Sequence, residues 1–470
     1  MLSKCGAYDL ALDLFEKSKT LDNHVWTVVI DTLSEVERYY EAYQMFLKMK
    51  ELGICINAAT LTALIKSIIG LRDLVIAKEI YNFIQQSKIK VNTQLSNSLI
   101  NMFFKCGDEE MAVWVYENMN ERDAFTLSII LDNLASCEKF EKGYNLYLSW
   151  KNSKNFIDEV VIISVIKLII GLCNHDLAIS FYKEMNRNIF NNIIICNGFM
   201  HLFSKYGNLN LAEDIFNSMQ NRDLYSWSIM IDTYAEHGMG NHCLQLLQNM
   251  RKYGVKPNEI TLISVLNGLS HSGMVSEALH LYYSITQDFQ IPTTQKHQHC
   301  IVDALGRNGR MEEAENFIHT EIPNPDVVTW VTLLGACRKF VDVERAERIA
   351  EYALKLDITN SSIYVLLGNT YSAAGMMNKV ERIRNVMYER GIVKIPGMTW
   401  GYINGKKECF VANDTNHQDI EEIVKYSMSL NKEIQKYGYQ PNYNFVVREF
   451  KNEEDKIEHL CSHSERLFIS

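Results

Sequence analysis

Apolar and polar positions alternate with the period of an α-helix along almost the whole chain. In one segment Ala42, Met45, Phe46 and Met49 recur at spacings of three and four, which places them on one helix face. Such segments follow one another in pairs, and the first of each pair reads like "WTVVIDTL" or "LSNSLINMF". The pattern predicts a series of helical hairpins whose apolar faces must be covered by neighbouring hairpins.

The hairpins repeat with an ordered alternation of lengths. The stretches "LSKCGAYDLALDLF", "FKCGDEEMAVWVY" and "FSKYGNLNLAEDIF" match one another and align Gly6, Gly107 and Gly207. Units begin at residues 23, 58, 93, 124, 159, 193, 224, 259 and 295, and those at 93 and 193 are short, with 31 residues each. Because a lone hairpin cannot bury its apolar faces, the units must stack, which predicts an α-solenoid. We expect Gly107, Gly207 and Gly309 to end first helices in the left-handed conformation.

Composition narrows the class of protein. The 470 residues are 47% hydrophobic and 22% charged, which is typical of a globular chain. The apolar run "VVIISVIKLIIGLC" is too short to span a bilayer and holds Lys167, so we expect no membrane partner. Eleven cysteines form no C-x-x-C pair, which argues against a disulfide framework and a four-cysteine zinc site. The net charge of −10 is the wrong sign for a nucleic-acid binder and favours a protein-binding scaffold.

Several short motifs accompany the alternating unit lengths, namely "SKCG", "GVKPN" (254 to 258) and "LGRNGRMEEAENFI" (305 to 318). Together these features resemble the pentatricopeptide repeat (PPR) family, in the subclass whose P-, L- and S-type units alternate. Residues 327 to 394 resemble the two extension (E) motifs of that subclass, and "PGMTWGYINGKKECFVANDTNHQDIEEI" resembles the opening of its C-terminal DYW cytidine-deaminase domain.

The resemblance implies a fold and a division into domains. The fold class is an all-α solenoid, a right-handed superhelix of helical hairpins, with an incomplete C-terminal α/β deaminase-like domain. The expected domains are a partial S-type repeat at 1–22, repeats at 23–326, extension motifs at 327–394 and the beginning of a deaminase domain at 395–470.

The resemblance also implies that each repeat addresses one base of single-stranded RNA through the fifth and last residues of the unit. Aspartate only accepts hydrogen bonds and suits U or G, whereas asparagine also donates and suits A or C. By the family's pattern, Ser or Thr at the fifth position selects purines and Asn selects pyrimidines. The array then reads A, weak A, U, G, none, U, A, none and one unclear base. The two repeats that read no base hold Ile163 and Ile263 at the fifth position, and these side chains cannot form hydrogen bonds. The pairs are Thr27 with Asn57, Thr62 with Asn92, Asn97 with Asp123, Ser128 with Asp158, Ile163 with Asn192, Asn197 with Asp223, Ser228 with Asn258, Ile263 with Thr294, and His299 with Asp326.

Two observations leave alternatives open. The polar residues at the unit ends could merely cap helices, which is their commonest use, although their recurrence in register favours recognition. The negative charge opposes phosphate binding, and basic residues just after the fifth positions are expected to compensate locally; they are Lys66, Lys105, Lys167 and Lys205. His297, beside His299, is interpreted as a residue of the helix surface or core.

The C-terminal segment predicts a β-hairpin around Asn404-Gly405, an acidic helix from about Gln418 to Tyr437, and a last helix holding "KIEHLCSHSERLF". By the resemblance His463 would be a Zn²⁺ ligand and Glu465 the catalytic general acid/base of an H-x-E motif. The two cysteines that complete such a site are missing, so Zn²⁺ is expected for the complete domain and not for this chain. As written, the chain is expected to be inactive as a deaminase.

The leading hypothesis is a sequence-specific RNA-binding protein that specifies C-to-U RNA editing in the mitochondrion or plastid. A targeting peptide is not visible in the sequence. The chain begins in mid-repeat and ends in mid-domain, which favours a fragment over a shortened protein that recruits a deaminase in trans. The alternatives are an RNA stability or processing factor without editing, and a protein-binding helical-repeat scaffold.

Overall fold

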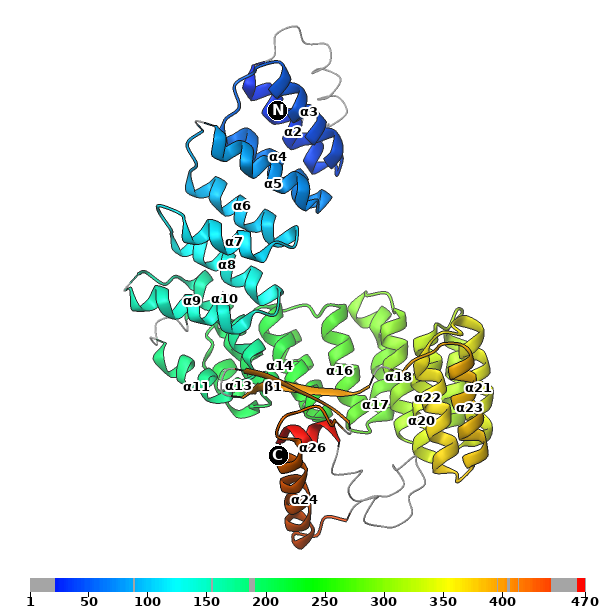
Figure 1. Ribbon diagram of the computed structural model, residues 1–470. Coiled ribbons are helices and arrows are strands. Elements are labelled where there is room, and N and C mark those ends of the chain that lie inside the picture. The colour runs from blue at the N-terminus through cyan, green and yellow to red at the C-terminus, as the bar shows by residue number, and fades with distance from the viewer. Residues whose placement is uncertain are drawn as a thin grey trace. The chain divides into compact units, whose positions relative to one another are not determined.

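The computed structural model describes residues 22–87, 89–153, 155–185, 191–394, 396–403, 406–412, 414–440 and 463–469. The expectations for the partial repeat at 1–22, for Asn404-Gly405 and for residues 456–462 therefore fall almost entirely outside the described residues. The chain divides into two compact units, Met1–Leu172 and Cys173–Ser470. Both consist mainly of helices, as Figure 1 shows.

The first compact unit is a stack of helical hairpins. Its first helices pack against one another in sequence order, and those of the first four hairpins each also pack on their own second helix. The first helices are α2 (Asn23–Glu35), α4 (Ala58–Leu71), α6 (Thr93–Lys105), α8 (Ala124–Ser136) and α10 (Glu159–Leu172). The second helices are α3 (Tyr39–Glu51), α5 (Leu74–Gln86), α7 (Glu109–Glu117) and α9 (Phe140–Asn152). This order confirms the predicted helical-hairpin repeat.

The second compact unit continues the same pattern. Its first helices are α12 (Ile193–Lys205), α14 (Leu224–Glu236), α16 (Glu259–His271), α18 (Gln295–Arg307), α20 (Val327–Phe340) and α22 (Ser361–Ala373). Its second helices are α11 (His175–Glu184), α13 (Leu209–Ser218), α15 (Gly240–Lys252), α17 (Val275–Ser284), which runs into the π-helix η3 (Ile285–Phe289), α19 (Met311–Glu321), α21 (Val343–Leu356) and α23 (Met377–Glu389).

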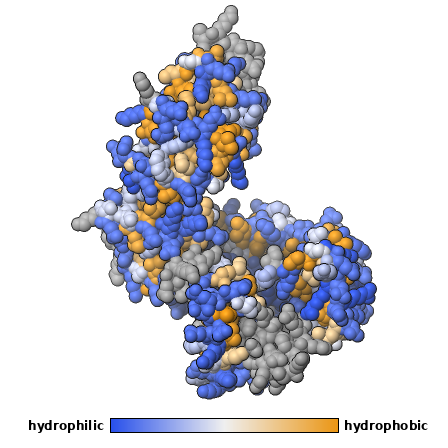
Figure 2. Space-filling view, viewed as in Figure 1, coloured by the Kyte–Doolittle hydropathy of each residue, from blue (hydrophilic) through white to orange (hydrophobic). Residues whose placement is uncertain are grey.

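The cores of the hairpins are apolar, and the helix ends follow from local sequence. Leu61, Phe103, Leu127 and Phe199 are among the side chains that are fully or almost fully buried. Gly107, Gly207 and Gly309 have φ of 86°, 66° and 75°, which confirms the predicted left-handed ends of α6, α12 and α18. The surface seen in Figure 2 is mainly hydrophilic with smaller hydrophobic patches.

The C-terminal residues contain the only strands among the residues that the structure describes. Strand β1 (Met398–Ile403) pairs antiparallel with β2 (Lys406–Val411), with Thr399 opposite Phe410. Helix α24 (Ile420–Lys436) matches the predicted acidic helix, and the short helix α26 (Ser464–Ile469) packs on both strands. The hairpin is therefore present, whereas a complete α/β deaminase fold is not shown.

Close packing between successive hairpins leaves no room for a Cβ atom at one glycine of α10. A Cβ atom added at Gly171 would overlap the ring of Phe140 at the start of α9. We therefore expect Gly171→Ala to lower the free energy of unfolding by about 1–3 kcal/mol, the usual effect of overpacking. Gly335 in α20 has open space around it. The control Gly335→Ala should instead raise stability by about 0.5–1 kcal/mol, because alanine favours the helix. Urea unfolding of both variants checks this, and equal shifts in one direction would contradict it.

Candidate nucleic-acid interface

The last residue of nearly every repeat caps the first helix of the next repeat. In each case the side-chain Oδ1 atom accepts a hydrogen bond from a backbone N–H in the first turn of that helix. The residues are Asn57, Asn92, Asp123, Asp158, Asn192, Asp223, Asn258 and Asp326. The capping alternative is therefore correct as a description of their structural role. Capping uses one polar atom of a side chain that carries two, so it does not exclude recognition.

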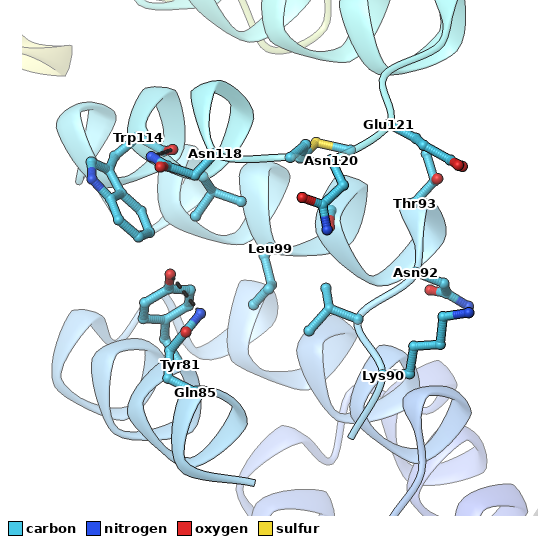
Figure 3. A pocket seen from close by; sticks show the side chains of 14 residues that line it. Tyr81, Gln85, Lys90, Asn92, Thr93, Leu99, Trp114, Asn118, Asn120 and Glu121 are labelled. Carbon is cyan, nitrogen blue, oxygen red and sulfur yellow. Dashed lines mark hydrogen bonds between the residues drawn. The ribbon is translucent and has the colours of Figure 1, made fainter. Parts of the chain in front are cut away.

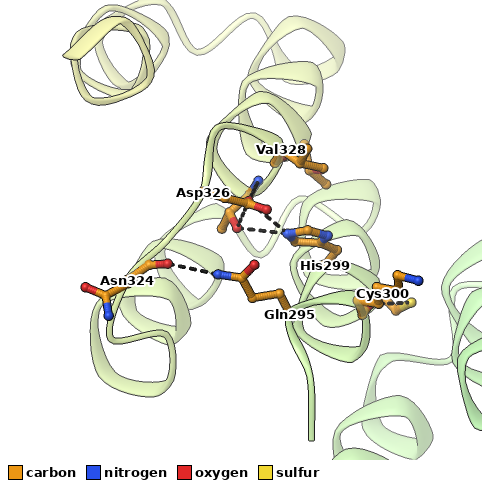
Figure 4. A network of polar contacts seen from close by, with 9 residues as sticks. Gln295, His299, Cys300, Asn324, Asp326 and Val328 are labelled. Carbon is orange, nitrogen blue, oxygen red and sulfur yellow. Dashed lines mark hydrogen bonds and ion pairs between the residues drawn. The ribbon is translucent and has the colours of Figure 1, made fainter. Parts of the chain in front are cut away.

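In two repeats the structure brings the fifth and the last residue into direct contact. The Nδ2 atom of Asn197 donates a hydrogen bond to Oδ1 of Asp223 at 3.1 Å. The Nε2 atom of His299 lies 3.0 Å from Oδ1 of Asp326, as Figure 4 shows. These residues are more than twenty positions apart in sequence, and the fold places each pair at the junction between two first helices.

In two other repeats a hydroxyl links the pair. The Oγ1 atom of Thr60 lies 2.7 Å from Oγ1 of Thr27 and donates to Oδ1 of Asn57. Thr261 connects Ser228 with Asn258 in the same way. These hydroxyls are not among the site residues predicted above, although their place three residues after the cap is visible in the sequence.

The remaining pairs are less closely connected. The hydroxyl of Thr62 donates to the backbone of its own helix, and so does that of Ser128. Asn97 and Asp123 line one groove of about 630 Å³ between α6 and α8. Asn97 is only 7% exposed and its Oδ1 atom is buried without a hydrogen-bond partner, as is Oδ1 of Asn197. Buried hydrogen-bond acceptors normally have a partner, so two amide oxygen atoms without one, at equivalent positions of two repeats, are unusual.

The carboxyl groups of two unit-end aspartates are held in the ionised form. Partial burial acts to raise the pKa of Asp223, but hydrogen bonds from Ser226 and Asn197 outweigh it and lower that pKa. Burial also acts to raise the pKa of Asp326, and hydrogen bonds from Thr329 together with the neighbouring His299 lower it. At neutral pH both side chains are therefore pure hydrogen-bond acceptors.

Apolar side chains are exposed at the second position of many repeats, beside the polar pairs. Phe125 is 59% exposed and lines the same groove as Asn97 and Asp123. The others that share this position are Val160, Ile194, Tyr225, Ile260 and Val328. Bases of single-stranded nucleic acid stack on such surfaces. These residues are not among the predicted site residues, because apolar positions in the helices were expected to be covered by neighbouring hairpins.

Three of the four lysines expected to attract phosphate are already paired. Lys66 donates to Asp31 at 2.6 Å, Lys167 to Asp132 at 2.9 Å and Lys205 to Glu236 at 2.8 Å. In each case the acid lies in the first helix of a neighbouring repeat. The expectation of a local positive surface was therefore wrong for these three, because stacking places an acid beside each of them.

His297 is fully buried in α18, so it belongs to the core and not to the surface. Its Nδ1 atom accepts a hydrogen bond from the backbone N–H of Thr294, and its Nε2 atom is buried without a partner. Burial lowers the pKa of this imidazole. The side chain therefore helps to begin α18 in the neutral form.

The H-x-E residues lie at the start of α26, beside the β-hairpin. Nδ1 of His463 is 3.9 Å from Oε2 of Glu465, and both side chains are more than half exposed. The hydroxyl of Thr399 in β1 donates to Ser464 at 2.9 Å, which holds this helix against the hairpin. No group of three His, Cys, Asp or Glu side chains able to hold a metal occurs within the described ranges. A catalytic zinc site needs about three protein ligands, so the role of His463 as a zinc ligand stays a prediction.

No helix in the described part of the chain is long and apolar enough to cross a bilayer.

Family models match several parts of the chain. A model described as "Pentatricopeptide repeat-containing protein" matches residues 3–119, and the PPR repeat family model matches 222–271. The PPR repeat model matches 194–224, 260–288 and 299–319, and the E motif model matches 340–401.

Curated relatives from Arabidopsis thaliana align along nearly the whole chain. A mitochondrial pentatricopeptide repeat-containing protein is 29% identical over 476 residues, covering 100% of this chain and 74% of its own length. A chloroplastic one is 29% identical over 471 residues, covering 100% of this chain and 58% of the relative. Another mitochondrial one is 30% identical over 425 residues, covering 90% and 55%. The chain thus spans little more than half the length of most of these relatives.

Solved structures show distant similarity. The maize pentatricopeptide repeat protein PPR10 is 15% identical with a TM-score of 0.40, covering 95% of this chain and 79% of its own. PPR10 in complex with an 18-nucleotide psaJ RNA element is 12% identical with a TM-score of 0.45, covering 98% of this chain and 87% of that chain.

The family models find both the repeats and the E motif in this chain. The chain therefore belongs to the pentatricopeptide repeat family, in its PLS class.

Proposed function

We propose that the protein binds single-stranded RNA in a sequence-specific manner during organellar RNA processing. The observation that carries this proposal is the junction between repeats, where a polar pair such as Asn197 and Asp223 meets beside an exposed apolar side chain. Polar atoms can discriminate base edges, and apolar surfaces can hold base faces. The recurrence of both at fixed places in successive repeats supports one base per repeat.

The organelle is proposed from the relatives. Two of those described above are named mitochondrial and one chloroplastic. We propose that this protein acts in the mitochondrion or the plastid.

Binding should be tested first with short RNAs. Gel-shift titrations at low salt would compare an RNA carrying the predicted order A, A, U, G, any, U, A with RNAs altered at one position each. We expect changes opposite the connected pairs, such as Asn197 with Asp223, to weaken binding by about 1–3 kcal/mol each. Equal affinity for all RNAs would refute the reading, and no affinity at low salt would favour a protein-binding scaffold.

The finer proposal is that the bound RNA is marked for C-to-U editing. The family's pattern would place the edited cytidine four nucleotides 3′ of the base facing His299 and Asp326. In this proposal the Zn²⁺ belongs to a complete deaminase domain or to a deaminase acting in trans, and His463 and Glu465 form part of such a site. Sequencing of organellar transcripts after depletion would test it. Loss of one edited site is expected, whereas unchanged cytidines with altered transcript ends would favour a stability or processing factor.

The paired lysines lead to a prediction on salt dependence. Asp31→Asn and Asp132→Asn together should release Lys66 and Lys167, which lie one helical turn beyond fifth positions of their repeats. We expect the slope of log K against log salt to steepen by roughly 0.7 for each released lysine that reaches a phosphate. Filter binding between low and moderate salt would measure this slope.

A control removes one negative charge, half the change of the double variant, away from the polar pairs. Glu41→Gln breaks the pair with Arg38 on the second helix α3. It should leave the slope unchanged. If Glu41→Gln steepened the slope as much as the double variant, general charge and not the released lysines would explain the effect.

A further inference from the structure

A hollow of about 450 Å³ lies between the second helices α5 and α7, beneath the two chain segments that join these repeats. Figure 3 shows Tyr81, Gln85 and Trp114 at one end of it and Lys90 and Asn92 at the other, with Leu99 between them. We call it the short-repeat hollow, because it is formed by the short repeat that begins at residue 93.

The length of one helix explains why the hollow exists. Helix α7 has 9 residues, whereas α5 and α9 have 13 each. The missing turn leaves space under the segment 118–121. A hollow also occurs at the other complete short repeat, lined by Asn191, Ile193, Cys196, Ser218, Met219, Gln220 and Asn221. Each of these residues is one hundred positions after a residue that lines the first hollow, so the feature is built by the repeat type.

The two hollows differ in size and chemistry. The second has about 110 Å³, too little for a nucleoside, and the residue equivalent to Trp114 is Asp214. In the first hollow, Trp114 is 48% exposed, and its ring packs edge to face with that of Tyr81, with the ring centroids 6.2 Å apart. Only the first hollow therefore combines a half-exposed indole with room for a ring.

The walls of the short-repeat hollow are suited to an adenine-type base. The indole of Trp114 lines the hollow, and so do the amide groups of Gln85, Asn118 and Asn120. Gln85 donates one amide hydrogen to Tyr81 and Asn118 donates one to the backbone of Trp114, so each keeps a second hydrogen and its oxygen for a ligand. Asparagine and glutamine amides match the donor and acceptor atoms of the adenine edge. Aromatic stacking supplies affinity that amides alone would not give.

The hollow adjoins the candidate RNA interface. Asn92, the last residue of the preceding repeat, lines it, and Thr93 lines both the hollow and the groove that holds Asn97 and Asp123. We propose that the short-repeat hollow binds an adenine-type nucleobase against Trp114. The base could come from the bound RNA or from a free nucleoside, and the experiment separates these sources.

The test uses the full chain and 2-aminopurine riboside, a fluorescent isomer of adenosine whose emission is quenched by stacking. We expect saturable quenching that unlabelled adenosine reverses. Trp114→Ala should weaken this binding at least fivefold, and Asn120→Ala, at an exposed site where folding is not at risk, at least twofold. Asp214→Ala, at the equivalent position of the other short repeat, should have no effect. Equal quenching in the Trp114→Ala variant would overturn the proposal, and so would the absence of quenching both for the riboside and for a label placed in bound RNA.

A second arm places 2-aminopurine in RNA, at the base predicted to face the repeat that ends at Asn92. Quenching in the complex that depends on Trp114 would identify the RNA as the source of the base. Quenching of the free riboside alone, with RNA bound but its label unquenched, would identify a free nucleoside. If the riboside binds while gel shifts show no RNA binding, the proposed function fails and the hollow remains a nucleobase site. If RNA binds and neither probe is quenched, the hollow proposal fails alone.

Discussion

Asp223→Asn should change the base preferred by the repeat at 193–223 from U to C. Asp223 has a lowered pKa and acts only as an acceptor, which suits the imino N–H of uracil. Asparagine offers both a donor and an acceptor, which suits cytosine. We expect RNA with U opposite this repeat to lose about 1–3 kcal/mol of binding free energy, and RNA with C to gain affinity. Gel shifts with the four bases at that single position measure both changes.

The same substitution should leave the fold unchanged, which makes the result easy to interpret. Asparagine caps a helix about as well as aspartate, so the hydrogen bond to the N–H of Ser226 can be kept. Asp73→Asn is the matched control, because Asp73 caps the second helix α5 and belongs to no reading pair. An altered base preference in the Asp73→Asn variant, or none in Asp223→Asn, would show that Asp223 does not read the base.

The repeat architecture could be predicted because its determinants are local. Helical periodicity, a polar cap at each unit end and a glycine after the first helix all lie within a few residues of the structure they specify. Gly107, Gly207 and Gly309 therefore adopt the expected conformation. The hairpin of β1 and β2 follows from an equally local turn signal.

The interactions between repeats could not be predicted in the same way. Lys66 meets Asp31 thirty-five residues away only because two first helices stack in one register. The contact of Asn197 with Asp223 and the short-repeat hollow depend on the same stacking and on the length of a second helix. At the C-terminal end, His463 immediately precedes the helix that holds Glu465 and packs on the hairpin. A pair of residues does not define a metal site, so the catalytic assignment stays a prediction.

Phe125 and Leu127 in α8 should separate RNA binding from stability. Phe125 is largely exposed and lines the groove with Asn97 and Asp123, whereas Leu127, two residues further on, is fully buried. Phe125→Ala should weaken RNA binding by about 1–3 kcal/mol, the usual contribution of a stacking platform. Its free energy of unfolding should change by no more than about 0.5 kcal/mol, as is usual at the surface.

Leu127→Ala should have the opposite effect, because it removes apolar contacts between α8 and its neighbours and leaves a cavity. We expect a loss of about 2–5 kcal/mol in stability, seen as faster amide hydrogen exchange in α8 and the helices packed on it. At low temperature, where the repeat remains folded, RNA affinity should be close to that of the parent. If Phe125→Ala left RNA affinity unchanged while Leu127→Ala weakened it, the exposed apolar residues would not hold bases, and binding would depend only on the integrity of the repeat. The opposite result would assign the second position of each repeat a direct role, with the polar pair beside it selecting the base.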